Sequence, residues 1–306
     1  MRKLLGRLLN IRKWKFLITY LISIFLTIQI FSGIVTAENP HNNYTIERNI
    51  TYHTVNNNQL KLNLYQNKKS GLRPILIVIH GGGWIKGSKD DGDEPFFAPY
   101  FDWGFSVVNI DYRLASTALA PAAVEDSICA LRWVTRNAAK YKFDTKKIVL
   151  TGFSAGGHLA LTAGTIPNVT KFDRLCPGNE PLKVATIINW SGITDVKDLL
   201  IGSHQKYFAL QWFGNQITSQ KLELAKSISP INFVRHGLPP ILTIHGEKDT
   251  FVPYSQATRF HQALDNAGVI NQLYTVRGAE HGGYSKVQKR KIYTVIKMFL
   301  KKLGVI

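Results

Sequence analysis

Apolar and polar residues follow two different patterns in the part of the chain that begins near residue 49. Residues 50–55 and 60–65 are β-branched runs in which apolar and polar side chains alternate, and the three asparagines at 56–58 separate them. Alternation with a period of two is typical of a strand with one covered face, and a short asparagine-rich connection favours a tight turn. The pattern predicts an antiparallel β-hairpin.

The later apolar runs are nearly continuous, which is typical of parallel strands that helices cover on both faces. Segments with a helical period of apolar residues lie between them. This order predicts an α/β fold, namely a doubly wound, mostly parallel sheet of eight strands with the antiparallel hairpin at its N-terminal edge. The six later strands are expected at residues 75–80, 105–112, 147–152, 185–190, 241–245 and 272–276, and the helices at 121–140, 155–163, 254–267 and 285–303.

Residues 192–240 form a connection that is longer than a simple crossover between neighbouring strands. The segment holds four aromatic residues in a short stretch: Tyr207, Phe208, Trp212 and Phe213. One interpretation is a small lid over a binding site. The other is that these aromatic side chains form the buried face of one helix.

The first 37 residues differ from the rest of the chain. They hold six lysines and arginines and no acid, followed by an apolar stretch at residues 16–35 and by Ala37. A basic start, an apolar stretch and small residues are typical of a signal peptide, here cleaved after Ala37. The alternative is an N-terminal membrane anchor, because residues 16–35 are long enough to span a bilayer. Either interpretation exports residues 38–306 as one domain, periplasmic, secreted or anchored to the membrane.

The composition, with 45% apolar and 19% charged residues in 306, is that of an ordinary globular protein and excludes a disordered or fibrous chain. The formal net charge is +18, but six of the positive charges lie in the first 37 residues. Others cluster in the predicted C-terminal helix, where a solvated basic face needs no ligand. We therefore expect no nucleic-acid partner. Attraction to an anionic membrane or polymer is the second interpretation of the basic surface.

Cys129 and Cys176 are the two cysteines of the chain. An oxidising compartment permits a disulfide between them. The alternative is a buried helical thiol at Cys129 and a separate loop thiol at Cys176.

The segment Gly152-Phe153-Ser154-Ala155-Gly156 lies between an apolar strand and a predicted helix. A serine between two such glycines sits on a sharp, strained turn that presents its hydroxyl at the edge of a sheet. Ser154 is therefore a candidate nucleophile.

A serine nucleophile needs a base that takes its proton and an acid that orients the base. In this fold the expected order along the chain is serine, acid, histidine. Asp249 follows the predicted strand at 241–245, and His281 follows the last one. Both therefore lie at the same edge of the sheet as Ser154. Asp195, which follows the preceding strand, is the alternative acid.

The run His80-Gly81-Gly82-Gly83-Trp84 directly follows the strand at 75–80. Glycines there free backbone N–H groups to face a substrate, and the N–H of the residue after the nucleophile completes an oxyanion hole. We expect the N–H groups of Gly81, Gly82 and Ala155 to hold the oxyanion. This chemistry requires no metal and no cofactor.

Two charged segments are interpreted as structural. The acids within residues 90–94 do not have the spacing of a calcium loop, and acids before a helix are an ordinary N-terminal feature. Asp111 and Arg113 are interpreted as an ion pair or turn rather than as catalytic groups.

With these motifs, together with Asp111-Tyr112-Arg113-Leu114 and residues 121–126, the chain resembles the α/β-hydrolase esterase family over about residues 50–304. The likeness is greatest to its bacterial feruloyl-esterase-like and arylformamidase-like branch, near the hormone-sensitive-lipase-like esterases. The chain has Ala115-Ser116-Thr117 where the latter usually carry Pro-Glu. The resemblance implies an α/β-hydrolase fold and an exported serine hydrolase that cleaves small-molecule carboxylic esters through an acyl-enzyme, with Ser154, His281 and Asp249 as its catalytic residues.

Two alternatives remain at this point. An arylformamidase-like amidase or a peptidase would use the same fold and the same residues. A non-catalytic binding module on a hydrolase scaffold is the alternative of another class, and the complete set of nucleophile, base, acid and glycine loop disfavours it.

Overall fold

The computed structural model describes residues 44–92, 94–167 and 172–306. The expected signal peptide or anchor at residues 1–37 lies outside the described residues. Within the described ranges, no helix is long and apolar enough to cross a membrane.

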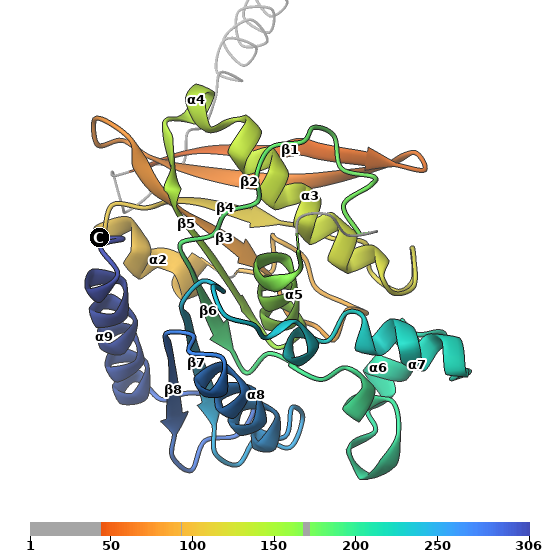
Figure 1. Ribbon diagram of the computed structural model, residues 1–306. Helices are drawn as coiled ribbons and strands as arrows, with labels where there is room; N and C mark the ends of the chain where they lie inside the picture. The colour runs from red at the N-terminus through yellow and green to blue at the C-terminus, as the bar shows by residue number, and fades with distance from the viewer. Residues whose placement is uncertain (1–43, 93, 168–171) are drawn as a thin grey trace, which may run out of the picture. The chain divides into compact units, whose positions relative to one another are not determined.

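An eight-stranded sheet forms the centre of the described domain, with the strand order β1-β2-β4-β3-β5-β6-β7-β8 (Figure 1). The strands from β4 to β8 in this order pair in parallel, whereas β1, β2 and β4 pair antiparallel. This topology confirms the predicted α/β-hydrolase sheet with an antiparallel N-terminal edge. The strands are β1 (Tyr44–Val55), β2 (Asn58–Asn67), β3 (Arg73–Ile79), β4 (Ser106–Ile110), β5 (Phe143–Phe153), β6 (Thr186–Trp190), β7 (Ile241–Gly246) and β8 (Asn271–Val276).

The predicted hairpin turns through two asparagines. Val55 pairs with Asn58, and the φ angles of Asn56 and Asn57 between them are +47° and +64°. Positive φ at both central residues matches the right-handed twist of the flanking strands, and asparagine tolerates it better than most residues do.

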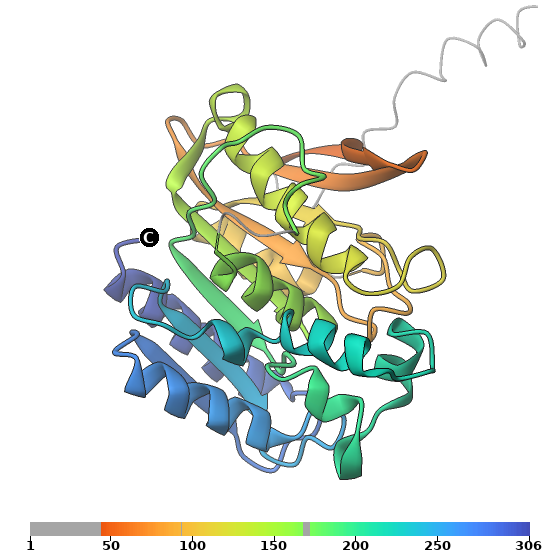
Figure 2. The same ribbon diagram turned by 45° about the vertical axis from the view of Figure 1, so that its right-hand side comes forward.

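Helices cover both faces of the sheet (Figure 2). Alternate residues of β3 separate the two layers of the core: Ile75, Ile77 and Ile79 lie in the cluster with α3, α5 and α8, and Leu76 and Val78 lie in the cluster with α2 and α9. Both faces of the central strands are therefore buried. The helices are α2 (Glu94–Asp102), α3 (Ala122–Arg136), α4 (Ala138–Tyr141), α5 (Ala155–Thr165), α8 (Tyr254–Asn266) and α9 (Lys286–Lys302).

The long connection at residues 192–240 folds into short helical pieces. The rings of Trp212 and Phe213 are buried, and Trp212 stacks on Trp84 with centroids 4.1 Å apart. Tyr207, in contrast, is 62% exposed. The pieces are η1 (Lys197–Leu199), η2 (Gly202–His204), α6 (Tyr207–Trp212), α7 (Ser219–Lys226) and η3 (Pro230–Phe233).

The buried arginine of the Asp-Tyr-Arg-Leu segment has a different partner from the expected one. Arg113 donates to both carboxylate oxygens of Asp126 on α3 and to Glu125, and Asp111 pairs with Lys89. Asp111 and Arg113 therefore do not pair with each other, because Arg113 points to the helix that packs on the sheet, but each of them forms a structural ion pair with another residue. A disulfide joins Cys129 of α3 to Cys176.

Candidate active site

Ser154 occupies the sharp turn between β5 and α5, with φ +58° and ψ −119°. A non-glycine residue in this region is strained, and the packing around the turn maintains the strain. A Cβ at Gly156 would lie 2.0 Å from the carbonyl oxygen of Ile79, and one at Gly152 would lie 2.4 Å from Gly156. Both glycines are thus required by the close approach of the turn to the neighbouring strand.

Ser154, His281 and Asp249 are linked by hydrogen bonds. The Oγ of Ser154 lies 2.9 Å from Nε2 of His281, and Nδ1 of the same ring lies 2.7 Å from Oδ2 of Asp249. They follow β5, β8 and β7 in turn, so the parallel sheet brings them to one edge. The three predicted residues come together although 127 positions separate Ser154 from His281.

Asp249 is fully buried at its side chain and accepts from several donors. Burial alone raises the pKa of this carboxyl, but hydrogen bonds from His245, His281 and the Val252 N–H together hold the pKa well below its usual range. The carboxylate is therefore ionised and can only accept. It follows that Nδ1 of His281 carries a hydrogen, and the lone pair of Nε2 faces the hydroxyl of Ser154.

Three backbone N–H groups are free to face an oxyanion. Among the described residues, the N–H groups of Gly81, Gly82 and Ala155 donate to no acceptor. Gly82 lines one pocket with Ser154 and His281, and its φ of +105° requires glycine. Gly81 packs against the Phe153 carbonyl, where a Cβ would come within 3.0 Å.

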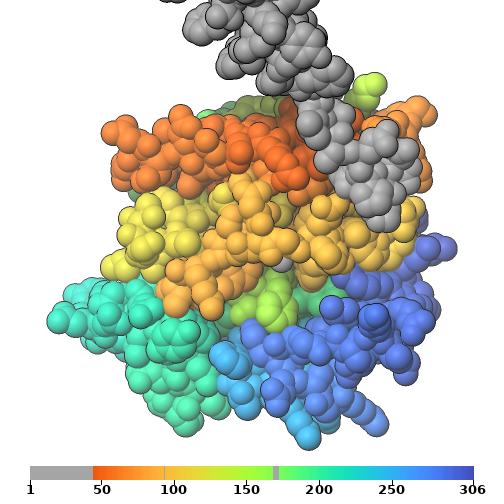
Figure 3. Space-filling model, turned by 180° about the vertical axis from the view of Figure 1, so that it is seen from behind, coloured from red at the N-terminus to blue at the C-terminus, as the bar shows by residue number. Residues whose placement is uncertain are grey.

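The pocket that contains Ser154 has a volume of about 220 Å³. Tyr207 and Phe208 from α6 form one wall, and Phe251 stacks on the His281 ring at 5.4 Å. Figure 3, a view from behind, shows the chain near residue 150 at the bottom of a hollow between the orange segment after β3 and the blue C-terminal part. Tyr207 and Phe208 therefore fit the interpretation of residues 192–240 as a lid over a site. Trp212 and Phe213, which are buried, fit the interpretation as a buried aromatic face.

A second pocket of about 360 Å³ adjoins the first and shares His281 and Phe153 with it. Aromatic residues from β6 and from the C-terminal part line it, among them Trp190 and Tyr293. His281 therefore borders both spaces.

The alternative acid, Asp195, lies outside this arrangement. Its carboxylate pairs with Arg259 on α8 at 3.4 Å, and its backbone N–H donates to Gln256. These contacts anchor the start of residues 192–240 to α8.

Sequence reasoning missed one group next to the acid. Nε2 of His245 lies 2.9 Å from the Val252 carbonyl and 3.4 Å from Oδ2 of Asp249, so its hydrogen is shared between them. In the sequence, His245 is the last residue of the strand expected at 241–245. The signal in the sequence is its position, four residues before Asp249 and near the end of the strand that Asp249 follows.

His158, one helical turn after Ser154, is a second buried imidazole beside the nucleophile. Its backbone N–H donates to the Ser154 carbonyl at 3.0 Å. Nε2 donates to the Ile228 carbonyl at 2.8 Å, and Nδ1 accepts from the Trp84 indole at 3.3 Å. Burial lowers the pKa of His158 to about 4. The neutral ring thus connects the turn to the glycine loop and to residues 192–240.

We expect His158 to make the protein less stable in acid. Its pKa is about 4 in the folded state and about 6.5 when unfolded, so only the unfolded chain takes up a proton between these values. The free energy of unfolding should therefore fall by about 3 kcal/mol between pH 7 and pH 4 through this residue. Urea unfolding at several pH values measures the slope. The exposed His236→Gln variant should keep the wild-type slope and His158→Gln should have a shallower one; equal slopes would contradict the assignment.

Comparisons with known proteins agree with this geometry. Residues 62–264 match the BD-FAE family. Carboxylesterase NlhH of Mycobacterium tuberculosis is 41% identical over 220 residues, which cover 68% of this chain and 66% of that protein. Esterase LipC of the same organism is 28% identical, with coverage of 68% and 53%. The chain spans about half the length of LipC, LipQ and LipM.

Solved structures show the same fold over nearly the whole domain. A truncated carbohydrate esterase from gut microbiota has a TM-score of 0.73 at 27% identity and covers 85% of this chain and 98% of its own. The butyrate-bound esterase Est2 of Thermogutta terrifontis has a TM-score of 0.72 at 25% identity, with coverage of 89% and 99%.

Proposed function

The chain belongs to the BD-FAE family, and from this membership we propose that it is an exported carboxylesterase that cleaves small-molecule esters through an acyl-enzyme on Ser154. The observation that carries the proposal is the pair of hydrogen bonds, 2.9 Å and 2.7 Å long, that joins the serine, the imidazole and the buried carboxylate. Relatives that bear the names of esterases support the class of reaction.

The reaction proceeds in two acyl transfers. The Oγ of Ser154 attacks the ester carbonyl carbon while Nε2 of His281 takes the hydroxyl proton. The negative charge that forms on the carbonyl oxygen is held by the N–H groups of Gly81, Gly82 and Ala155. His281 then passes the proton to the leaving alcohol. A water molecule, activated by the same imidazole, hydrolyses the acyl-enzyme.

Asp249 has a positioning and electrostatic role in both steps. Its negative charge stabilises the imidazolium that forms, and its hydrogen bond keeps the hydrogen on Nδ1. His245 and two backbone N–H groups fix the carboxylate in turn. The imidazole is therefore held in the required tautomer before substrate arrives.

Export is proposed on two supports. One is the basic and apolar character of residues 1–37. The other is the Cys129–Cys176 disulfide, because disulfides persist in oxidising compartments outside the cytoplasm. Processing of the expressed chain tests this: N-terminal sequencing of the mature protein is expected to begin at Glu38, and recovery of the full-length chain from the membrane would favour the anchor.

Labelling with a fluorophosphonate and a comparison of substrates test the proposed activity. We expect one labelled peptide, with the adduct on Ser154, and hydrolysis of p-nitrophenyl acetate and butyrate by the same preparation. The amidase alternative predicts faster turnover of N-formylkynurenine than of either ester. A folded protein that takes no label, or carries it on another residue, would contradict the mechanism.

A further inference from the structure

We propose that Arg73 and the lysines around it form a binding site for a phosphate group, at the edge of the sheet opposite to Ser154. Arg73 is the first residue of β3, whereas the glycine loop follows the last residue of that strand. About 20 Å of strand therefore separates the two places. The proposed site is independent of the catalytic residues.

The guanidinium of Arg73 is buried with one side unpartnered. The residue is 8% exposed, its backbone N–H donates to the Lys142 carbonyl at 2.9 Å, and its Nη1 donates to the Leu72 carbonyl at 3.3 Å. Nε and Nη2 have no hydrogen-bond partner among the described residues. These two nitrogens form the side of an arginine that binds two oxygens of one anion in parallel. Leaving two N–H groups of a buried cation unpaired is costly, and an anion that the side chain turns to meet would satisfy both of them.

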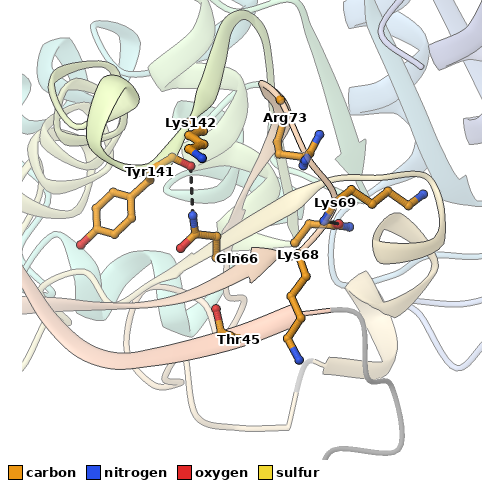
Figure 4. A pocket seen from close by; sticks show the side chains of 9 residues that line it. Thr45, Gln66, Lys68, Lys69, Arg73, Tyr141 and Lys142 are labelled. Atoms are coloured by element: carbon orange, nitrogen blue, oxygen red, sulfur yellow. Dashed lines mark hydrogen bonds between the residues drawn. The ribbon is translucent and has the colours of Figure 1, made fainter.

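The charged residues that line the pocket at Arg73 are all basic. Lys68, Lys69 and Lys142 line the same pocket, which has a volume of about 250 Å³, and no Asp or Glu is among its lining residues in the described part of the chain. Figure 4 shows these side chains with Gln66, whose amide donates to the Tyr141 carbonyl. The three lysines are exposed, and their long side chains can turn toward a bound group.

Four cations favour a phosphate over a singly charged carboxylate. Nε and Nη2 of Arg73 bind two oxygens of the phosphate, and the three lysines neutralise its remaining oxygens and its second negative charge. The cavity is large enough for a phosphate with part of the molecule that carries it. Leu72, beside Arg73, is 65% exposed. An apolar side chain next to exposed lysines favours the headgroup of an anionic phospholipid as the source, with a free phosphate as the other source of the same chemistry.

Binding of the full-length protein to inorganic phosphate, measured by isothermal titration calorimetry, is the first test. We expect saturable binding that Arg73→Lys weakens about tenfold, because lysine keeps the charge but lacks the paired donors. Arg73→Gln and the double variant Lys68→Gln/Lys69→Gln should weaken it too. The matched control is Lys301→Gln/Lys302→Gln, which removes the same charge from exposed positions on α9. No saturable binding by the wild type, or equal losses in the two double variants, would overturn the proposal.

Vesicles distinguish the two sources of the phosphate. Co-sedimentation is measured with phosphatidylcholine vesicles that contain or lack phosphatidylglycerol, using wild type and each Arg73 variant. If the protein binds the anionic vesicles more strongly and this binding depends on Arg73, the source is a lipid headgroup. If wild type and Arg73→Lys bind the vesicles equally while binding of inorganic phosphate still depends on Arg73, the source is a free phosphate. Hydrolysis of p-nitrophenyl acetate should be unchanged in every arginine and lysine variant. Ser154→Ala should bind phosphate like the wild type, which separates failure of this site from failure of the proposed activity.

Discussion

Replacement of Ser154 by alanine is expected to lower the turnover number for p-nitrophenyl acetate by about a millionfold. The substitution removes the Oγ that lies 2.9 Å from Nε2 of His281 and leaves the imidazole without a nucleophile to activate. The residual rate would come from the oxyanion donors and from binding alone. Among the described residues, Nε2 of His281 is hydrogen-bonded to the hydroxyl of Ser154 and to that of no other serine, so we expect no other described serine to take over the attack.

The Ser154→Ala protein should still fold. Alanine retains the Cβ, so the strain at φ +58° is the same in both proteins and the surrounding contacts of the turn are preserved. Thermal unfolding and fluorophosphonate labelling are measured on the same preparations. Ser203→Ala, at an exposed position of η2, is the matched control and should retain full activity. A Ser154→Ala protein that keeps even one per cent of the wild-type rate would refute the assignment of the nucleophile.

The grouping of Ser154, Asp249 and His281 could be predicted because of how parallel strands terminate. Ser154 comes directly after β5, and Asp249 and His281 lie in the loops that follow β7 and β8. The carboxyl ends of parallel strands lie at one edge of the sheet. The order along the chain then limited the choice to few candidates. No tertiary distance was needed, since topology alone brings the residues together.

The partners of charged side chains were not predictable in this way. Arg113 pairs with Asp126, thirteen residues away on a helix, rather than with Asp111, and the rotation of α3 decides this. The strand register likewise buries Arg73 beside Phe143, its partner on β5. A periodic pattern reports which face of an element is apolar, but not which polar groups meet across elements.

The residues that form the walls of the pocket could not be predicted from the sequence, for a related reason. In α6, Phe208 lines the pocket that contains Ser154, whereas Trp212, four residues later, is fully buried and stacks on Trp84. Both are aromatic and both lie in one short helix, so composition could not tell the residue that faces the site from the residue that packs in the core. The shape of the substrate pocket therefore depended on tertiary packing.

Replacement of Asp249 by asparagine is expected to lower the turnover number by about ten-thousandfold, through the tautomer of His281. The N–H groups of Phe251 and Val252 donate to Oδ1 of Asp249 at 3.0 Å and 2.9 Å. In the variant they need an acceptor, so they hold the amide oxygen at that position. The amide NH₂ must then take the place of Oδ2, where it donates to Nδ1 of His281. The hydrogen of the imidazole moves to Nε2, and the ring can no longer accept the proton of Ser154.

The neighbouring imidazole tolerates this arrangement. The hydrogen on Nε2 of His245 keeps the Val252 carbonyl, 2.9 Å away, as its acceptor, so this imidazole is not left unpaired by the asparagine. The variant should therefore fold, and its defect should be in the turnover number rather than in KM. The ¹⁵N chemical shifts of the His281 ring are the direct measurement and should show the hydrogen on Nδ1 in the wild type and on Nε2 in Asp249→Asn. Asp102→Asn, at an exposed position of α2, is the control. If the loss of activity occurs while the hydrogen stays on Nδ1, Asp249 acts through its charge and not through the tautomer that it selects.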